Sequence, residues 1–323
     1  MSAAERQTQA VVISEPGNVA LQQVALKQPE PTDVVIRTVY TSISAGTERM
    51  LLAGQMPHPM LSLPVVPGYE TVGRIVAIGT EVDPVWQDRL VYVGGALCYD
   101  GVNAAWGGQA AELFADVSRV IPLDGVELQQ GVLLALAATA LHGIDRAAPA
   151  AGERLLVLGQ GPVGQLAARI ARQRGVWVAV ADRTPSRLAR AVADQVINVE
   201  ETPVTEALTE PVTTIVEATG SMAALTAALP QLAQGGTILL LGYYNKLDLP
   251  YMPLFLKEAQ LLTAKEWAPG DLLRCRDMLA DGSLAVAPLI THCAPITEVT
   301  QAYKTALDDP DCLKLVLDWS ALQ

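Results

Sequence analysis

A glycine-rich turn at residues 159–164 constrains the fold of this chain more than any other feature. The turn, GQGPVG, follows the apolar run LLVL at 155–158, which is typical of a buried parallel strand. Gly159 permits a tight turn out of the strand, Gly161 lets the backbone approach a pyrophosphate, and Gly164 lets the next helix pack closely against the strand. The start of that helix offers unpaired N–H groups to phosphate. The turn therefore predicts a dinucleotide-binding site, although a glycine-rich turn in an unrelated parallel sheet would show the same spacing.

An acidic residue at the end of the next strand pattern indicates which dinucleotide is bound. The run VWVAV at 176–180 is followed by Asp182. An acid roughly 20 residues beyond the glycines accepts hydrogen bonds from the adenosine ribose and repels a 2′-phosphate, which favours NAD over NADP. Arg183, beside it, weakens this preference because an arginine there could tolerate a phosphate. Arg183 and Arg187 could contact the adenosine side of the cofactor or form the solvated start of a helix.

The composition limits the kinds of partner that this chain can have. Its 323 residues suffice for two domains, and 34 acidic against 22 basic side chains give a formal net charge of −12. Such an acidic chain is a poor partner for nucleic acid or an anionic membrane surface. No apolar run reaches the roughly 18 to 20 uncharged residues of a spanning helix, and the N-terminal segment MSAAERQTQ has no apolar signal region. We therefore expect a soluble, cytoplasmic protein with no membrane span.

The order of the predicted elements divides the chain into a β-rich part and an α/β part. Up to residue 125 the sequence shows strand patterns without intervening helices. Gly68, Gly73 and Gly79 interrupt these patterns and favour bulges or tight bends, as in a small barrel. Further along, strands alternate with helices, which predicts parallel βαβ units with right-handed crossovers. The last strand pattern, KLVLDW, is expected to return to the first part.

Several motifs spread over nearly the whole chain resemble the medium-chain dehydrogenase/reductase superfamily. They are SAGTE at 44–48, PGYETVG at 67–73, ATALHG at 138–143, GQGPVG at 159–164, EATG at 217–220 and GGTILLLG at 235–242. The resemblance implies an α/β protein with the medium-chain dehydrogenase fold. A β-rich GroES-like catalytic domain would cover 1–125 and 265–323, and a doubly wound parallel Rossmann domain would cover 126–264. It also implies an oxidoreductase that uses a nicotinamide dinucleotide.

Three departures from the superfamily pattern argue against a catalytic zinc ion. Zinc-dependent members carry a cysteine before the G-T-D/E triplet, a histidine in G-H-E, and a further cysteine or acid on the helix before the cofactor domain. This chain has Ala45, Tyr69 and Ala135 at those positions, and none of these side chains is a usual zinc ligand. We therefore expect no catalytic metal. The cysteines form no C-x-x-C pair and are expected to be reduced thiols rather than structural zinc ligands: Cys98, Cys275, Cys293 and Cys312.

Within the superfamily, the segments ISAGTERMLLAGQMP and LPVVPGYETVGRI resemble the bacteriochlorophyllide dehydrogenases. Those enzymes oxidise the 3-(1-hydroxyethyl) group of a chlorin or bacteriochlorin to 3-acetyl with NAD. The resemblance implies NAD as the cofactor and a large apolar tetrapyrrole as the small-molecule substrate. The segment YYNKLDLPYMPLFLKEAQL at 243–261 fits an apolar wall of such a site. His58, in a proline-bracketed loop, could be an axial ligand of a magnesium tetrapyrrole or a surface histidine.

Two other functions stay open at this point. One is a zinc-independent quinone or enoyl reductase of the same superfamily; such enzymes usually prefer NADPH, and Asp182 argues against that cofactor. The other is a nucleotide-binding protein without catalytic activity, which the missing zinc ligands would allow. The presence of Thr47 and Tyr69 argues against it.

The candidate catalytic residues must act without a Lewis acid, because hydrogen bonds then have to stabilise the alkoxide that develops when a secondary alcohol is oxidised. Thr47 matches the Ser/Thr relay of the superfamily, or it is a turn residue that bonds its own backbone. Tyr69 takes the place of a zinc-binding histidine, so its hydroxyl could donate to the alkoxide; otherwise it is a packed core tyrosine. An ordinary pKa of about 10 makes it a poor base. Glu48 and Glu70 match positions that orient neighbouring groups.

The predicted cofactor site gathers the glycine turn and the loops at the carboxyl edge of the sheet. Its expected residues are Thr139, Gly159, Gly161, Pro162, Val163, Gly164, Asp182, Arg183, Arg187, Thr219 and Gly242. His142, three residues after Thr139, could relay a proton near the cofactor or be a satisfied helix histidine. Superfamily members often dimerise through the edge of the Rossmann sheet. The strand GGTILLLGYY could form such a homodimer contact or be an ordinary buried strand.

Overall fold

The computed structural model describes residues 6–56 and 62–322 and divides the chain into two units. The first unit runs to Ala135 and adds Arg276–Ser283 and the residues from Ile290 onward. The second unit consists of Leu136–Cys275 and Leu284–Leu289. The first two changes of unit, after Ala135 and after Cys275, come later in the chain than the boundaries expected at 125 and 265. The short turn at Gln130–Leu133 accounts for the first difference, because it packs against strands of the first unit.

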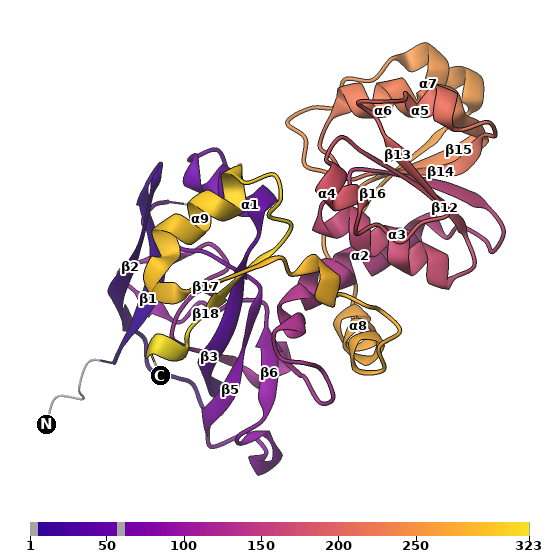
Figure 1. Ribbon diagram of the computed structural model, residues 1–323. Coiled ribbons are helices and arrows are strands. Elements are labelled where there is room, and N and C mark those ends of the chain that lie inside the picture. Colours follow the sequence, from indigo (N-terminus) through magenta and orange to yellow (C-terminus); the bar gives the residue numbers. More distant parts are fainter. Residues whose placement is uncertain (1–5, 57–61, 323) are drawn as a thin grey trace, which may run out of the picture. The chain divides into compact units, whose positions relative to one another are not determined.

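The first unit is built on two sheets in which most neighbouring strands are antiparallel (Figure 1). One sheet has the order β7-β2-β1-β4-β8, and the other has the order β10-β6-β5-β3-β18-β17 with β9 also paired to β3. The strands are β1 (Gln7–Glu15), β2 (Asn18–Leu26), β3 (Asp33–Ile43), β4 (Val65–Val66), β5 (Thr71–Ile78), β6 (Leu90–Val93), β7 (Tyr99–Asp100), β8 (Asn103–Ala104), β9 (Glu112–Asp116), β10 (Val120–Pro122), β17 (His292–Pro295) and β18 (Leu315–Asp318).

The bulges that the glycine pattern predicts occur where β5 pairs with β3. A Cβ atom on Gly73 would lie 2.3 Å from the carbonyl oxygen of Arg37, so only glycine lets the two strands approach this closely. The pairing register also shifts between Thr38 and Tyr40. β18 pairs with β3 and not with the second unit, which confirms that the final strand pattern returns to the first part. The helices α1 (Ala45–Leu52) and α9 (Val299–Asp308) pack together in this unit.

A parallel sheet with the order β13-β12-β11-β14-β15-β16 forms the second unit. Numbered from its first strand, this is the order 3-2-1-4-5-6 of a doubly wound dinucleotide-binding sheet, as the sequence predicts. Its strands are β11 (Arg154–Leu158), β12 (Trp177–Asp182), β13 (Gln195–Asn198), β14 (Val212–Glu217), β15 (Leu232–Leu240) and β16 (Gln260–Thr263). The helices are α2 (Leu134–Ala147), α3 (Pro162–Gln173), α4 (Pro185–Leu188), α5 (Val204–Ala207), α6 (Met222–Ala228), α7 (Tyr251–Lys257) and α8 (Asp271–Ala280), of which α2 and α8 cross the boundary between units.

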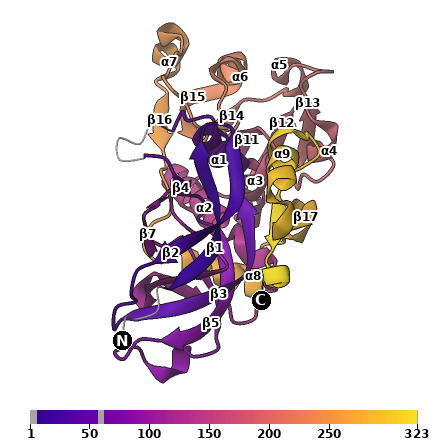
Figure 2. The same cartoon turned by 90° about the vertical axis from the view of Figure 1, so that its left-hand side faces the viewer.

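The edge strands of the parallel sheet are β13 and β16, which decides between the two readings of the GGTILLLGYY strand. β15 contains most of GGTILLLG and lies between β14 and β16, so it is an ordinary buried strand. Figure 2 shows β16 beside β15, with α7 above them. In the parts of the chain that the structure describes, every helix is too short or too polar to span a bilayer.

Candidate active site

The hydroxyl of Tyr69 is the centre of a small cluster of hydroxyl groups in the first unit. Its Oη atom lies 2.5 Å from Ser44 Oγ and 3.3 Å from Thr47 Oγ1. Ser44 caps the N-terminus of α1, and Thr47 lies in the first turn of that helix. The structure therefore brings the predicted residues Thr47 and Tyr69 together. It adds Ser44, which the sequence analysis did not identify.

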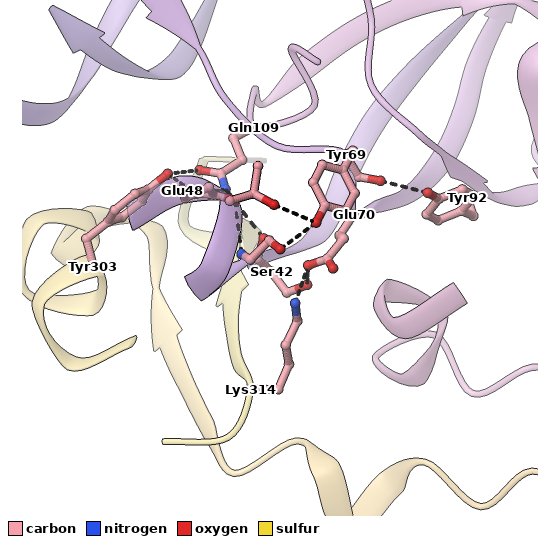
Figure 3. A network of polar contacts seen from close by, with 10 residues as sticks. Ser42, Glu48, Tyr69, Glu70, Tyr92, Gln109, Tyr303 and Lys314 are labelled. Carbon is pink, nitrogen blue, oxygen red and sulfur yellow. Dashed lines mark hydrogen bonds and ion pairs between the residues drawn. The ribbon is translucent and has the colours of Figure 1, made fainter. Parts of the chain in front are cut away.

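Two aromatic neighbours fix the position of Tyr69. Tyr92 Oη donates a hydrogen bond of 2.7 Å to the carbonyl oxygen of Tyr69, a contact drawn in Figure 3. The ring of Trp106 stands edge-on to the Tyr69 ring, with centroids 5.3 Å apart and planes at 66°. Trp106 itself has a left-handed φ of 69°, which is unusual for a bulky residue. A hydrogen bond of 2.7 Å from the Ala96 N–H to the Trp106 carbonyl holds this conformation.

The protonation state of Tyr69 makes it a hydrogen-bond donor. Burial raises the pKa of its phenol well above the ordinary value, and the negative charge of Glu70 raises it further. Hydrogen bonds with Ser44 and Thr47 act in the opposite direction but are weaker causes. The phenol is therefore neutral near pH 7. It can donate to an alkoxide oxygen, and it is not a base.

The buried side chain of Glu48, a residue of α1, anchors the start of that helix. It is 1 % exposed, and its carboxylate accepts the Ser44 N–H at 3.0 Å, the Gln109 amide at 3.1 and 3.2 Å, and the hydroxyl of Tyr303. Figure 3 shows Glu48 between Tyr303 and Gln109. Burial is the largest cause that raises the Glu48 pKa to about 7, although the bonds from Tyr303 and Ser44 lower it. Through the Ser44 backbone, this buried group positions the hydroxyl cluster.

Glu70 anchors the other side of the cluster through a buried ion pair. Lys314 Nζ contacts Glu70 Oε2, and both residues are at most 2 % exposed. Ser42 Oγ donates a hydrogen bond of 2.6 Å to the same carboxylate oxygen. Lys314 directly precedes β18, so the pair ties the end of the chain to the strand that follows Tyr69 (Figure 3). These contacts support the expectation that Glu70 and Glu48 orient neighbouring groups, which stays a prediction.

The side chains around Tyr69 do not fit a zinc ion. Within residues 6–56 and 62–322, no group of three or more histidine, cysteine, aspartate or glutamate side chains is arranged to hold a metal. Next to the Tyr69 hydroxyl are the neutral hydroxyls of Ser44 and Thr47, which are not usual zinc ligands. The two nearby carboxylates are already bound, Glu48 by three donor groups and Glu70 by Lys314. We therefore derive no catalytic step through zinc.

The glycine turn of the second unit has the geometry of a phosphate cradle. A Cβ atom on Gly164 would lie 1.9 Å from the Gly159 carbonyl oxygen, which shows how closely α3 packs against the end of β11. Gly159 adopts a left-handed φ of 90°, and a Cβ there would lie 2.7 Å from Thr219 Cγ2. Nothing lies within 4 Å of a Cβ built on Gly161, so space is open above the turn. Pro162 and Val163 begin α3 at the point where its N–H groups face this space.

Asp182 connects this turn to the end of β12. Its Oδ2 accepts the Gln160 N–H at 2.6 Å, and its Oδ1 accepts the Thr184 N–H at 2.8 Å. A carboxylate offers about four acceptor positions, so Asp182 keeps capacity for ribose hydroxyls. The backbone bonds hold its side chain at the carboxyl edge of the sheet, beside the turn.

Three buried polar atoms without a partner belong to the turn and to α4. Among the described residues, Gln160 Oε1, Ser186 Oγ and Arg187 Nε are buried and lack a hydrogen-bond partner. Gln160 belongs to the turn, and Ser186 and Arg187 begin α4 directly after β12. Such orphan groups are rare in folded proteins and need an explanation. Ribose and phosphate oxygens would supply acceptors and donors at this place, so the residues present fit a dinucleotide.

The remaining predicted site residues also lie in the second unit. His142 and Thr139 are on α2, and His142 Nδ1 is 3.7 Å from Asp271 Oδ2. Arg183 is exposed after β12. Thr219 and Gly242 follow β14 and β15 at the carboxyl edge. The relay role of His142 stays a prediction. His58 lies outside the described residues.

Protein-family models match both parts of the chain. The model for the alcohol dehydrogenase GroES-like domain matches residues 30–125, and the model for zinc-binding dehydrogenase matches residues 162–268. These matches fall on the β-rich part and on the parallel-sheet part, respectively.

One named relative is similar over nearly the full length of this chain. The 2-desacetyl-2-hydroxyethyl bacteriochlorophyllide A dehydrogenase of Cereibacter sphaeroides is 35% identical over 97% of this chain and 99% of its own. Among solved structures, an Escherichia coli alcohol dehydrogenase complexed with NADH has a TM-score of 0.86 at 21% identity, covering 97% and 99% of the two chains. A Sinorhizobium meliloti protein bound to NADP has the same TM-score at 20% identity, covering 98% and 100%. These likenesses confirm the predicted α/β fold.

Proposed function

Because the chain belongs to the medium-chain dehydrogenase/reductase superfamily, we propose that it oxidises the 3-(1-hydroxyethyl) group of a bacteriochlorophyllide to acetyl, with NAD and without a catalytic metal. The name of the Cereibacter relative supports the substrate. The observation that carries the proposed chemistry is the hydroxyl cluster of Tyr69, Ser44 and Thr47. By the resemblance of the sequence motifs, Tyr69 takes the position of a zinc-binding histidine of the zinc-dependent members.

In this mechanism the substrate alcohol loses a hydride and a proton and becomes a ketone. A bound nicotinamide supplies the hydride acceptor. Tyr69 donates a hydrogen bond to the substrate oxygen and stabilises the negative charge that develops there when the hydroxyl proton leaves to water. Before the reaction, the Tyr69 hydroxyl can donate to Ser44 or Thr47, so it turns between two acceptors and stays protonated throughout.

NAD is the proposed cofactor because of Asp182. Its carboxylate is fixed by the N–H groups of Gln160 and Thr184 at the end of β12. There it would accept the ribose hydroxyls of NAD and repel the 2′-phosphate of NADP. Arg187 and Arg183 lie close by in sequence, but the fixed negative charge is the stronger argument.

The test is an absorbance time course with purified, metal-stripped protein, NAD and 3-(1-hydroxyethyl) bacteriochlorophyllide. We expect the long-wavelength band to shift in step with NADH formation, and a chelator to leave the rate unchanged. NADP, run in parallel, should react more slowly. Loss of activity on chelation would reject the metal-free mechanism. No band shift in a protein that binds NAD would reject the tetrapyrrole and favour the reductase or the non-catalytic alternative.

We also propose that the protein forms a homodimer through β16 and α7. β16 is one of the two edge strands of the parallel sheet among the described residues, and its Leu261 is 39 % exposed. On α7, next to β15, Tyr251, Phe255 and Leu256 are more than half exposed. An edge strand beside exposed apolar side chains favours pairing with a second chain. Analytical ultracentrifugation should give a dimer, and Leu256→Glu should shift it to a monomer.

A further inference from the structure

Glu217 is a buried carboxylate that holds two loops at the carboxyl edge of the parallel sheet. It is the last residue of β14 and is 0 % exposed. It accepts the Thr219 N–H at 2.8 Å and the Gly220 N–H at 3.1 Å, and the Thr219 hydroxyl also contacts it. From the loop after β15, the hydroxyl of Tyr244 donates to the same carboxylate. One side chain therefore joins the loop after β14 to the loop after β15.

The two loops touch at Gly242. A Cβ atom there would lie 2.6 Å from Glu217 Oε2, from the Gly220 nitrogen and from the Tyr244 hydroxyl. Glycine at this position is what allows Tyr244 and Gly220 to reach Glu217 together. The Gly242 N–H donates to the Glu217 carbonyl at 3.0 Å, so backbone and side chain of Glu217 act on the same loop.

The first of these loops also packs against the phosphate turn. Thr219 Cγ2 lies so close to Gly159 that a Cβ on Gly159 would be 2.7 Å away. The position of Thr219 is set by two bonds to Glu217. Glu217 therefore controls how the loop after β14 meets the turn that follows β11.

The order of the strands indicates which half of a dinucleotide would meet these loops. Asp182, the residue for the adenosine ribose, ends β12 on one side of β11. β14 and β15 lie on the other side of β11, and neighbouring strands are about 5 Å apart. A dinucleotide that crosses the edge with its pyrophosphate at the turn must then extend over β14 and β15 with its nicotinamide half.

We propose that Glu217 is a positioning residue for the nicotinamide half of the cofactor, acting through the loops that carry Thr219 and Tyr244. This inference rests on the proposed use of a nicotinamide dinucleotide. A buried charge costs several kcal/mol unless donors surround it, and a neutral side chain could cap a single loop. Glu217 accepts hydrogen bonds from two loops at once. This fits a site in which both loops must keep one fixed position relative to each other.

The test compares two ligands that differ only in the nicotinamide. NADH and ADP-ribose share the adenosine, the pyrophosphate and the second ribose, so calorimetric titration with each isolates the contribution of the nicotinamide ring. For Glu217→Gln we expect NADH affinity to fall at least tenfold while ADP-ribose affinity changes less than twofold. Tyr244→Phe, which removes the link to the second loop only, should give a smaller loss with the same selectivity. Glu206→Gln, on an exposed glutamate of α5, is the matched control and should change neither.

The outcomes separate this inference from the proposed function. Equal losses of both ligands in Glu217→Gln, or no loss of either, would overturn the role of Glu217 while the cofactor proposal stands. If Glu217→Gln does not fold, Tyr244→Phe decides, because an equal effect on NADH and ADP-ribose would overturn the inference. A wild-type protein that binds neither ligand would reject the dinucleotide itself, and the inference with it.

Discussion

The hydroxyl oxygen of Tyr69 lies 2.5 Å from the hydroxyl oxygen of Ser44. This distance is at the short end of the range for O–H···O hydrogen bonds. Because the Tyr69 pKa is raised, its phenol keeps its proton, and the pair offers a neutral hydrogen-bond donor. The stabilisation of the alkoxide should therefore depend on one oxygen atom.

Replacement of Tyr69 by phenylalanine removes that atom and keeps the ring against Trp106. We expect kcat to fall by about 10² to 10³, the usual effect of losing one oxyanion donor. The KM for NAD should stay within about twofold, because Tyr69 belongs to the first unit and the glycine turn to the second. Steady-state kinetics with the hydroxyethyl substrate measure both. A loss of less than tenfold would contradict the role of Tyr69.

Ser44→Ala tests the partner hydroxyl. The variant leaves the Tyr69 donor in place but removes its 2.5 Å acceptor, so we expect a smaller loss of kcat, about five- to tenfold, the equivalent of one ordinary hydrogen bond. Ser118→Ala, on an exposed turn before β10, is the control. A loss as large as that of Tyr69→Phe would mean that Ser44 itself faces the substrate.

Glu48 should make stability depend on pH in an unusual direction. Its pKa is about 7 in the folded protein against an ordinary value of 4.5, so the folded state binds a proton more tightly than the unfolded state. This contribution is complete below pH 4.5 and is lost as the pH rises towards 7. Glu48→Gln cannot titrate. Across this window the free energy of unfolding of wild type relative to the variant should fall by on the order of 3 kcal/mol in urea titrations. If the difference in the free energy of unfolding between wild type and Glu48→Gln does not change with pH, the raised pKa of Glu48 is refuted.

The parts of the fold that local sequence determines were predictable. The turn at 159–164 and Asp182 are set by strand, glycine and helix patterns within one βαβ unit, and the structure places them side by side. The return of the last strand to the first part also followed from its pattern. The place of Leu232–Leu240 in the sheet stayed open between an edge and a buried strand, because only the pairing order distinguishes the two.

The candidate site depended on contacts that no local pattern encodes. Tyr303 reaches Glu48 across 255 positions of sequence, and Lys314 reaches Glu70 across 244. Ser44 could have been found, because it lies three residues before Thr47, the spacing of neighbours on a helix. That inference needed the helix α1, which the sequence analysis did not predict. No sequence pattern around Trp106 indicates that it lies beside Tyr69, since this position follows from its left-handed backbone conformation.

Asp182→Asn should weaken the preference for NAD. The asparagine keeps one acceptor for the Gln160 or Thr184 N–H but loses the charge that repels a 2′-phosphate. We expect the ratio of kcat/KM for NAD to kcat/KM for NADP to fall at least tenfold, or about 1.4 kcal/mol. Asp248→Asn, an exposed residue paired with Lys246, should leave the ratio unchanged. A wild-type enzyme that prefers NADP would refute the assignment directly.

Removing one partner of the Glu70–Lys314 pair should lower the free energy of unfolding strongly, whereas removing both charges should lower it little. Lys314→Met leaves the Glu70 carboxylate buried without its counter-charge, so we expect a loss of about 3 to 5 kcal/mol in the free energy of unfolding. Glu70→Gln combined with Lys314→Met removes both charges and keeps an acceptor for Ser42, so most of that loss should return. Urea denaturation of the two variants measures the difference. If the double variant is as unstable as the single one, the packing of Lys314 before β18, and not its charge, is what fastens the end of the chain beside Tyr69.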